Sequence, residues 1–349
     1  MNVFKRIKRK LLNKKELEAL SFDADYVKSK LLQMEYELKY NSVAERLEKN
    51  KDLYQRYITK EPIFTFCMPT YNGEKYIARA LESILMQETT YNYKIWIIDD
   101  CSTDNTVNIV REYEKKYPEI FEVYVNPVNE RGLTVAPRIY NNIKTKYWMN
   151  FDQDDYWISK DKLERGITYF ENHPECTLFS SNLFIKFSNE LNAAYNGNQK
   201  SINFNFFDYP MPLGILMQTS ATMYRNVFNN ENLAHINSYI GTNKQHCILG
   251  DTFRNVFALS HGCGRYENSV DSVYTWTENG TWSKLNEGQQ EFYNLQYFYD
   301  SIDFFDDLAH KNKIKQVAEF YCKKTQEKVE MLNEKELNEF NSIKRGLNL

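Results

Sequence analysis

The chain has 349 residues, which is long enough for one large domain or two with an ample core. Lys and Arg total 44 against 47 for Asp and Glu, so the formal net charge is −3, and the overall charge gives no reason to expect nucleic acid as a partner. The six cysteines are scattered without a CxxC pair, which favours free thiols in a reducing cytosol over disulfides or a zinc site.

Residues 1–60 are strongly charged and helical in pattern, and they contain neither glycine nor proline. Residues 1–15 carry seven basic side chains and no acidic one, with apolar residues at helical spacing. A basic helix with one apolar stripe is typical of a segment that lies on an anionic membrane, and here it predicts contact with the inner membrane surface. The alternatives are a solvated extension, or a helix that packs on its own domain or on a second copy in a homodimer.

Membrane insertion is not expected. The sequence shows no signal peptide and no apolar run near the roughly 18 residues of a membrane span. We therefore expect a cytoplasmic protein that is held peripherally at the cytoplasmic face of the membrane.

From residue 63 the pattern changes, and short apolar runs alternate with amphipathic segments. The runs over 63–68, 94–98, 121–125 and 147–151 have the length and composition of buried strands, and helical spacing of apolar residues separates them. This alternation predicts an α/β fold with a mostly parallel central sheet and helices on both faces. In such sheets ligands bind beyond the carboxyl ends of the strands.

Polar side chains follow three of these four strands. Because the carboxyl ends of parallel strands lie at one edge of a sheet, we expect these side chains to converge there. The groups are Pro69, Thr70, Tyr71 and Asn72 after the first strand, Asp99, Asp100 and Ser102 after the second, and Asp152, Asp154 and Asp155 after the fourth.

The acidic stretch after the fourth strand predicts a cation site. Asp152 and Asp154 would point to the same side of an extended chain and offer hard oxygen ligands to Mg²⁺ or Mn²⁺, which can bridge to the phosphates of a nucleotide. By itself the stretch fits an acidic turn that caps the next helix equally well. The polar groups at the other strand ends favour the cation site.

Beyond the acidic turn the alternation continues less regularly. The expected elements are a helix over 163–172, a strand over 176–187, an exposed loop over 189–201, a buried stretch over 213–224, a helix after Gly250-Asp251, an aromatic turn over 274–283, and charged helices from 287 to the end.

Three of these segments, in this order, resemble the large inverting glycosyltransferase family known as family 2, which has the GT-A fold. They are the stretches FCMPTYNG over 66–73, IIDDCSTDNT over 97–106 and DQDDYW over 152–157. The resemblance is specific over 63–182 and weaker up to 285. It implies a GT-A domain over 61–285, between a basic helical extension over 1–60 and a C-terminal helical extension over 286–349.

The resemblance also implies roles for single residues. Asp154 would bind Mn²⁺ or Mg²⁺ on the diphosphate, Asp99 would hydrogen-bond the base, and Asp251 would deprotonate the acceptor hydroxyl. The remaining implied contacts are Pro69, Thr70, Tyr71, Asn72, Asp100, Ser102 and Asp152 around the nucleotide, and Asp155, Trp157, Gln218, Thr219, Ser220, Thr281 and Trp282 around the acceptor and sugar.

Several residues depart from the family pattern. Cys101 stands where the family usually has glycine, so a positive φ there would be strained. Thr277 stands where relatives often carry a histidine, and Gly250 stands where an acidic residue commonly precedes the base. Asp251 can therefore also be interpreted as an N-cap of the helix that follows it.

The leading functional hypothesis is a metal-dependent inverting glycosyltransferase that moves a sugar from a nucleoside-diphosphate sugar to a glycan or lipid-linked acceptor in surface polysaccharide synthesis. The metal would neutralise the departing diphosphate, and attack from the opposite side would invert the anomeric carbon. The Asp-Gln-Asp-Asp form of the acidic motif is similar to that of rhamnosyltransferases.

Three other classes of function compete with this hypothesis. A catalytically silent relative that acts as a subunit or scaffold is favoured by Thr277 and by the long terminal helices. A phosphotransferase with an Asp nucleophile would carry it after the first strand, whereas this motif follows the fourth. A Rossmann oxidoreductase would need G-x-G-x-x-G after the first strand, where 69–73 reads PTYNG.

Overall fold

The computed structural model describes residues 61–187, 190–194, 200–208, 218–277, 280 and 282–349. The helices and membrane contact expected over 1–60, residues 189 and 195–199 of the expected loop over 189–201, and the candidate residue Thr281 lie outside these ranges. The loop prediction is wrong for 190–194, because these residues pair antiparallel with the preceding strand and form a short strand of their own. Within the described residues, no helix is both long and apolar enough to span a bilayer.

A ten-stranded sheet runs through the molecule in the order β3-β2-β1-β4-β9-β6-β10-β5, with β7 beside β6 and β8 beside β10. The strands are β1 (Phe64–Thr70), β2 (Tyr93–Asp99), β3 (Phe121–Val125), β4 (Tyr147–Asn150), β5 (Tyr156–Trp157), β6 (Cys176–Phe187), β7 (Glu190–Ala194), β8 (Ile202–Asn205), β9 (Thr222–Arg225) and β10 (Cys263–Trp276).

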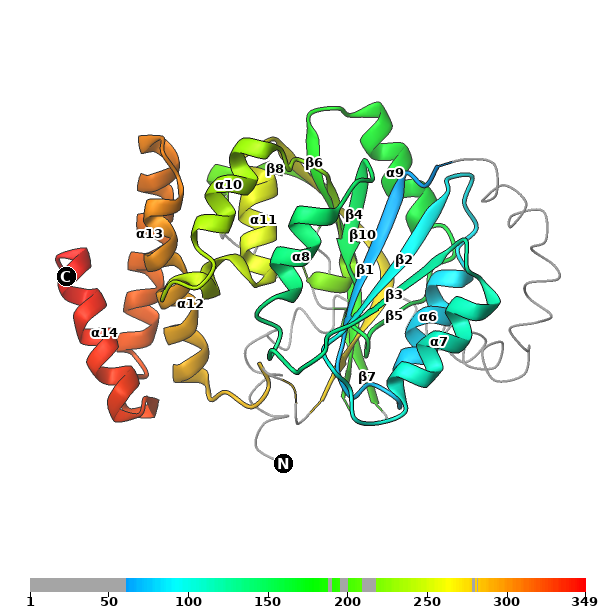
Figure 1. Cartoon of the computed structure of the whole chain (residues 1–349). Coiled ribbons are helices and arrows are strands. Elements are labelled where there is room, and N and C mark those ends of the chain that lie inside the picture. The colour runs from blue at the N-terminus through cyan, green and yellow to red at the C-terminus, as the bar shows by residue number, and fades with distance from the viewer. Residues whose placement is uncertain (1–60, 188–189, 195–199, 209–217, 278–279, 281) are drawn as a thin grey trace.

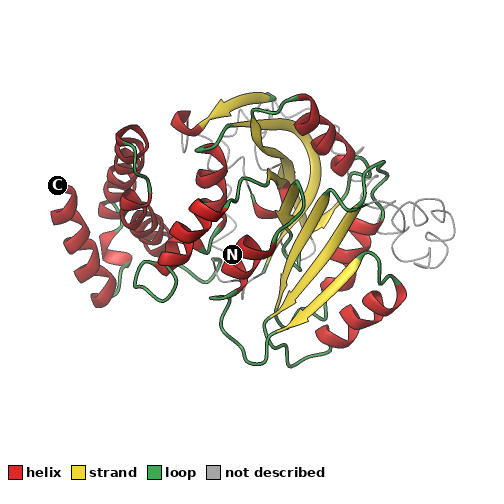
Figure 2. Ribbon diagram, turned by 45° about the horizontal axis from the view of Figure 1, so that its top comes forward, coloured by secondary structure: helices red, strands yellow, loops and turns green. Residues whose placement is uncertain are grey.

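Helices flank both faces of this sheet (Figures 1 and 2). The α-helices are α6 (Ile77–Leu85), α7 (Thr106–Lys116), α8 (Val135–Asn142), α9 (Lys162–Asn172), α10 (Asn230–Ser238), α11 (Asp251–Leu259), α12 (Glu287–Ser301), α13 (Leu308–Gln326) and α14 (Glu334–Leu347). The 3₁₀ turns are η1 (Phe206–Asp208), η3 (Thr219–Ala221), η4 (Gln245–Ile248), η5 (Ile302–Phe304) and η6 (Val329–Met331).

The expected α/β architecture is confirmed, and its parallel part is the N-terminal half. Strands β3, β2, β1 and β4 pair in parallel, so their carboxyl ends share one edge. Strand β9 then enters antiparallel to β4 and β6, while β6 and β10 are parallel to each other. The sheet is therefore parallel where the polar groups gather and mixed beyond that point.

Alternation along the strands divides the core between the two faces of the sheet. In β1, Phe64, Phe66 and Met68 join the cluster under α6, α7 and α9, whereas Cys67 joins the cluster under α8, α10 and α11. Successive strand residues point to opposite faces, and both faces are covered by helices, so the strands have near-continuous apolar sequences.

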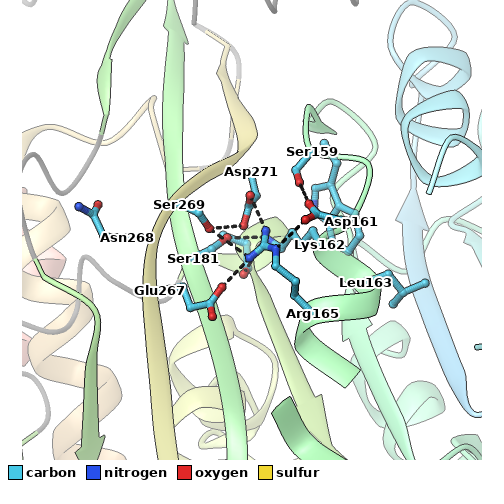
Figure 3. Close-up of polar contacts among 12 residues, drawn as sticks. Ser159, Asp161, Lys162, Leu163, Arg165, Ser181, Glu267, Asn268, Ser269 and Asp271 are labelled. Atoms are coloured by element: carbon cyan, nitrogen blue, oxygen red, sulfur yellow. Dashed lines mark hydrogen bonds and ion pairs between the residues drawn. The ribbon is translucent and has the colours of Figure 1, made fainter. Parts of the chain in front are cut away.

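Residues 274–283 were predicted to form a turn, and this prediction is wrong for 274–276, which end the 14-residue strand β10. The sequence pattern does not indicate this strand, because its register shifts between Glu267 and Val270 and again before Ser272, which breaks the two-residue alternation. Buried Asp271 in this irregular stretch is paired with Arg165 of α9 at 2.8 Å (Figure 3). A pairing across so many residues leaves no local signal in the sequence.

The helices expected after residue 287 are present as α12, α13 and α14, at the end of the molecule away from α6 and α7 (Figure 1). They share the cluster that covers one face of the sheet, because Phe304 of η5 packs edge-on against Phe253 of α11 at 5.2 Å between ring centres. Capping boxes at Asn286 and Asn333 fix the starts of α12 and α14.

Candidate active site

The ends of β1 and β2 are joined by a buried aspartate. Thr70 donates its hydroxyl to Oδ2 of Asp99 at 3.0 Å, and Ser102 donates its backbone N–H to Oδ1 at 2.8 Å and its hydroxyl to Oδ2 at 2.5 Å. The backbone N–H of Asn72 in turn donates to the Ser102 hydroxyl at 2.9 Å. Asp99 is 0% exposed, and its carboxylate fixes the side chains of Thr70 and Ser102.

Asp100 faces the loop that follows β3. Its carboxylate accepts hydrogen bonds from the side chain of Asn126 at 2.7 Å and from the backbone N–H groups of Glu130 at 3.0 Å and Gly132 at 2.8 Å. Burial would raise the pKa of Asp100, but these hydrogen bonds outweigh it and hold the pKa below its usual value. Asp100 therefore positions this loop beside the strand ends.

The backbone after both strands adopts left-handed conformations. Asn72 has a φ of 49° and Cys101 a φ of 63°. Asparagine tolerates this region, whereas a cysteine there is strained because its Cβ approaches the backbone. The strain expected where Cys101 replaces the usual glycine is thus present.

The acidic turn after β4 is tied to the end of β1 by Gln153. Its amide donates to the Tyr71 carbonyl at 2.9 Å and accepts from the Tyr71 N–H at 3.1 Å. A Cβ added at Gly73 would lie 2.1 Å from Oε1 of Gln153, so any other residue there would displace the Gln153 amide. The pair fixes the backbone of Tyr71 while its side chain is 45% exposed.

Asp152 and Asp154 flank Gln153 and lack donors. Within the described part of the chain, neither carboxylate accepts a hydrogen bond from the side chain or backbone of another residue. Burial, and then the charge of Asp154, raise the pKa of Asp152 to about 7, and burial also raises the pKa of Asp154. Two adjacent carboxylates without donors are a fitting ligand set for a hard divalent cation.

Asp155 and Trp157, predicted to border the acceptor, are both 0% exposed. Asp155 accepts from the backbone N–H of Thr275 at 2.8 Å and from the Gln218 amide at 3.0 Å, and the Trp157 indole donates to the Ser220 carbonyl at 2.7 Å. Burial, followed by the charges of the two neighbouring aspartates, raises the pKa of Asp155 well above its usual value. Through these hydrogen bonds, the two buried side chains fix the acidic turn.

The turn η3 connects the acidic turn to Asp251. Ser220 accepts from the Asp152 N–H at 3.0 Å, and the Thr219 hydroxyl donates to Asp251 at 3.5 Å. Asp251 is exposed and is the first residue of α11, whose N-cap is Gly250, so the interpretation of Asp251 as the N-cap is wrong. Of the other predicted acceptor-side residues, Trp282 is 42% exposed.

Two arginines that the sequence did not single out border the carboxylates. Arg79 of α6 donates to the Asp154 carbonyl at 3.0 Å and to the Thr275 hydroxyl at 3.2 Å. Arg254 of α11 is 6% exposed, and its charge opposes the raised pKa of Asp152. Within the described residues, the buried Nε atom of each has no hydrogen-bond partner.

A parallel half-sheet that presents carboxylates beyond β2 and β4, continued by antiparallel strands, is the architecture of GT-A nucleotide-sugar transferases. The family model described as Glycosyl transferase family 2 matches residues 65–230. The dTDP-rhamnosyl transferase RfbG of Shigella flexneri is 32% identical over 224 residues, which cover 61% of this chain and 72% of RfbG. The chain belongs to glycosyl transferase family 2.

Other relatives match over shorter stretches. The uncharacterized protein Rv1520 of Mycobacterium tuberculosis is 32% identical over 109 residues, which cover 31% of this chain and 32% of that protein, so the match spans about a third of its length. Among solved structures, S. aureus TarS 1–349 in complex with UDP-GlcNAc superposes with a TM-score of 0.54 at 17% identity, over 74% of this chain and 71% of that one. This likeness confirms the GT-A fold.

Proposed function

We propose that the chain is a metal-dependent inverting glycosyltransferase that moves a sugar from a nucleoside-diphosphate sugar to a glycan or lipid-linked acceptor in surface polysaccharide synthesis. The observation that carries the proposal is the pair Asp152 and Asp154, whose carboxylates accept no hydrogen bond from any other residue that the structure describes and which Gln153 ties to the end of β1. Family membership supports the reaction class. A putative teichuronic acid biosynthesis glycosyltransferase, TuaG of Bacillus subtilis, is 32% identical over 109 residues and supports the pathway class.

The nucleotide would lie over the ends of β1 and β2. The exposed ring of Tyr71 offers a surface on which a base can stack, and its backbone is already fixed by Gln153. Asp99 would orient the Thr70 and Ser102 groups that border the nucleotide. Such prior ordering lowers the entropy lost on binding.

Asp154, with Asp152 beside it, would hold Mn²⁺ or Mg²⁺ on the diphosphate, and the cation would supply charge neutralisation of the leaving group. Two contacts fix the turn that carries these ligands. Asp155 accepts from the Thr275 N–H, and Arg79 donates to the Asp154 carbonyl. The guanidinium of Arg254 lies buried nearby and would add positive charge on the α11 side of the site.

Asp251 would act as the general base. It is exposed at the start of α11, and Thr219 links it to the same η3 turn that bonds the Asp152 backbone. It would accept the proton of the acceptor hydroxyl while that oxygen attacks the anomeric carbon opposite the diphosphate, which inverts the configuration. The exposed ring of Trp282 would offer an apolar surface to a sugar ring.

The likeness to RfbG, named a dTDP-rhamnosyl transferase, makes dTDP-rhamnose the first donor to test. The protein is incubated with a panel of nucleotide sugars and Mn²⁺, and the released nucleoside diphosphate is measured. Asp154→Asn should lose activity, whereas Asp306→Asn, which removes an exposed carboxylate between η5 and α13, should keep it. Full activity of Asp154→Asn would refute the proposed metal role.

A catalytically silent subunit remains the second candidate, and Thr277 in place of the histidine of many relatives favours it. In this chain the Thr277 carbonyl accepts a hydrogen bond from the Gly280 N–H at 3.1 Å. The silent relative predicts no hydrolysis or transfer with any donor in the panel, together with no binding of nucleoside diphosphate and metal.

We also propose, from the sequence alone, that residues 1–15 attach the protein to the cytoplasmic face of the membrane through their basic side chains. Deletion of these residues should move the protein from the membrane to the supernatant after lysis. An unchanged distribution contradicts the attachment. Light scattering on the full chain tests the homodimer that the terminal helices could form: the mass of two chains supports it, and the mass of one chain contradicts it.

A further inference from the structure

A histidine, a cysteine and an aspartate meet outside the candidate active site, between η4 and the C-terminal end of α12. His246 and Cys247 belong to η4, and Asp300 belongs to α12. Their potential ligand atoms all lie within 4.8 Å of one another. Nε2 of His246 is 3.1 Å from Oδ2 of Asp300 and 3.5 Å from Sγ of Cys247.

Two of these separations are close to the edges of a tetrahedral zinc site. With Zn–N and Zn–O bonds of about 2.0 Å and a Zn–S bond of about 2.3 Å, tetrahedral angles put the nitrogen about 3.3 Å from the oxygen and about 3.5 Å from the sulfur. The two distances seen around His246, 3.1 Å and 3.5 Å, are close to both values. His246 is therefore placed to share one ion with both partners, and the separation of Cys247 from Asp300, at most 4.8 Å, would close to about 3.5 Å around that ion.

The other ring nitrogen of His246 supports the same interpretation. Nδ1 lies 3.2 Å from the carbonyl oxygen of Asn243, to which it can donate its proton. A backbone carbonyl on one nitrogen is the usual partner of a metal-bound histidine, because it leaves the lone pair of the other nitrogen free for the ion. That lone pair faces a carboxylate, so a cation or a proton must lie between them.

The three side chains differ in solvent exposure, so that one side of the cluster is open to solvent. Cys247 is 1% exposed, whereas the side chains of His246 and Asp300 are 36% and 19% exposed. Lys244, the nearby cation, is paired with Asp303 at 3.0 Å, so its charge is directed to a different carboxylate. We propose that His246, Cys247 and Asp300 bind a zinc ion, with water as the fourth ligand on the solvent side.

The competing state is an ion pair without metal. Burial would lower the pKa of His246, but the hydrogen bond to Asp300 outweighs it and raises the pKa to about 10, so an apo protein would hold an imidazolium beside the carboxylate. Zinc would displace the imidazolium proton and the thiol proton of Cys247, which now points at the Tyr297 carbonyl at 3.7 Å. Metal binding and the ion pair are therefore mutually exclusive.

The ion would stabilise the segment that leads to the candidate base. The turn η4 ends at Ile248, whose carbonyl accepts the Tyr140 hydroxyl at 2.9 Å, and α11 begins at Asp251 directly afterwards. A metal shared with Asp300 would fasten this segment to α12. Because it would bind the folded chain only, zinc should raise the melting temperature.

The test is metal binding by the full chain, without reference to activity. Protein stripped with a chelator is titrated with Co²⁺ under argon, and the thiolate-to-cobalt charge-transfer band is followed; zinc content is measured in parallel by mass spectrometry. We expect one thiolate-bound ion per chain by the amplitude of the charge-transfer band, displacement of that cobalt by zinc, and a higher melting temperature with zinc. A wild-type protein that shows no band and no zinc would establish the ion pair and overturn the proposal.

Variants assign the ligands. Cys247→Ser should abolish the band, and Asp300→Asn should weaken zinc binding by more than the about 10- to 100-fold that loss of an outer partner costs. Cys101→Ser is the matched control, because it removes a partly exposed thiol elsewhere, and it should bind zinc as the wild type does. Retention of the band by Cys247→Ser, or its loss in Cys101→Ser, would contradict the assigned site.

Discussion

Lys162 should make the stability of the protein rise with pH above neutrality. It lies at the start of α9 with 0% exposure, and Nζ donates to the Ser181 hydroxyl at 2.9 Å (Figure 3). Nζ also donates to the Ala221 carbonyl at 3.0 Å. Both acceptors are neutral, and the ring of Trp157 lies 4.9 Å away. Burial therefore lowers the pKa of Lys162 from 10.5 to about 7, against a smaller opposing effect of Asp271.

The sign and size of this pH dependence of stability follow from proton linkage. In the unfolded chain Lys162 titrates near its ordinary 10.5, so between about pH 7 and that value the unfolded chain binds more protons than the folded one. The free energy of unfolding consequently rises with pH across this window. A shift of this size corresponds to about 5 kcal/mol in total, of which about 2 kcal/mol falls between pH 7 and pH 9.

The measurement is urea unfolding of the wild type and of Lys162→Met at pH 7, 8 and 9. The difference between the two proteins cancels every other titrating group and should grow in favour of the wild type by about 2 kcal/mol over this range. Lys160→Met, which removes a lysine with a half-exposed side chain from the preceding turn, controls for the loss of a charge. If the difference in the free energy of unfolding between the wild type and Lys162→Met does not change with pH, the reasoning is refuted, since Lys162 would then keep its proton in the folded state.

Three further substitutions test local features. Cys101→Gly should raise stability by up to about 1 kcal/mol in thermal unfolding, because the strain at φ 63° exceeds the added chain entropy, and a lower melting temperature would contradict this. Gly73→Ala should displace Gln153 and weaken nucleotide–metal binding about tenfold in calorimetry, with unchanged affinity as the opposing result. Arg165→Met should lower the free energy of unfolding by about 3 kcal/mol, because Asp271, with a 3% exposed side chain, loses its partner; a loss below about 1 kcal/mol would mean that the pair is solvated.

The N-terminal half of the fold was predictable because its sequence obeys local rules. Strand β3 has the predicted bounds, 121–125, and the apolar spacing around Ile77 and Leu81 predicted α6. Convergence of polar groups at one edge followed from topology alone, since parallel strands end together. Local pattern and tertiary structure agree there, and the prediction of fold class depended only on that agreement.

The rest depends on pairings that the sequence does not display. Strand β10 is stabilised by Arg165 of α9 through Glu267 and Asp271, and the polar residues around these two give no alternating pattern from which a strand could be predicted. The burial of Asp155 and Trp157 depends on η3 and on Thr275 of β10, and the approach of Arg79 and Arg254 depends on how α6 and α11 pack. Residue type alone did not distinguish side chains that support the acidic turn from side chains that would contact a substrate.

The cluster of His246, Cys247 and Asp300 illustrates the same limit. Scattered cysteines without regular spacing argued against a zinc site, because sequence motifs detect ligands only when they recur at short intervals. Here two ligands are adjacent on η4, and the third comes from α12 much later in the chain. Only the packing of α12 beside η4 brings the three together.

Calorimetric titration of nucleoside diphosphate, with Mn²⁺ and with a chelator, tests most directly whether Asp152 and Asp154 hold a cation that carries the nucleotide. The account predicts binding to the wild type that requires Mn²⁺, and at least about a tenfold loss of affinity in Asp154→Asn with the fold retained. Equal affinity in the presence of the chelator, or unchanged affinity in Asp154→Asn, would contradict the central claim.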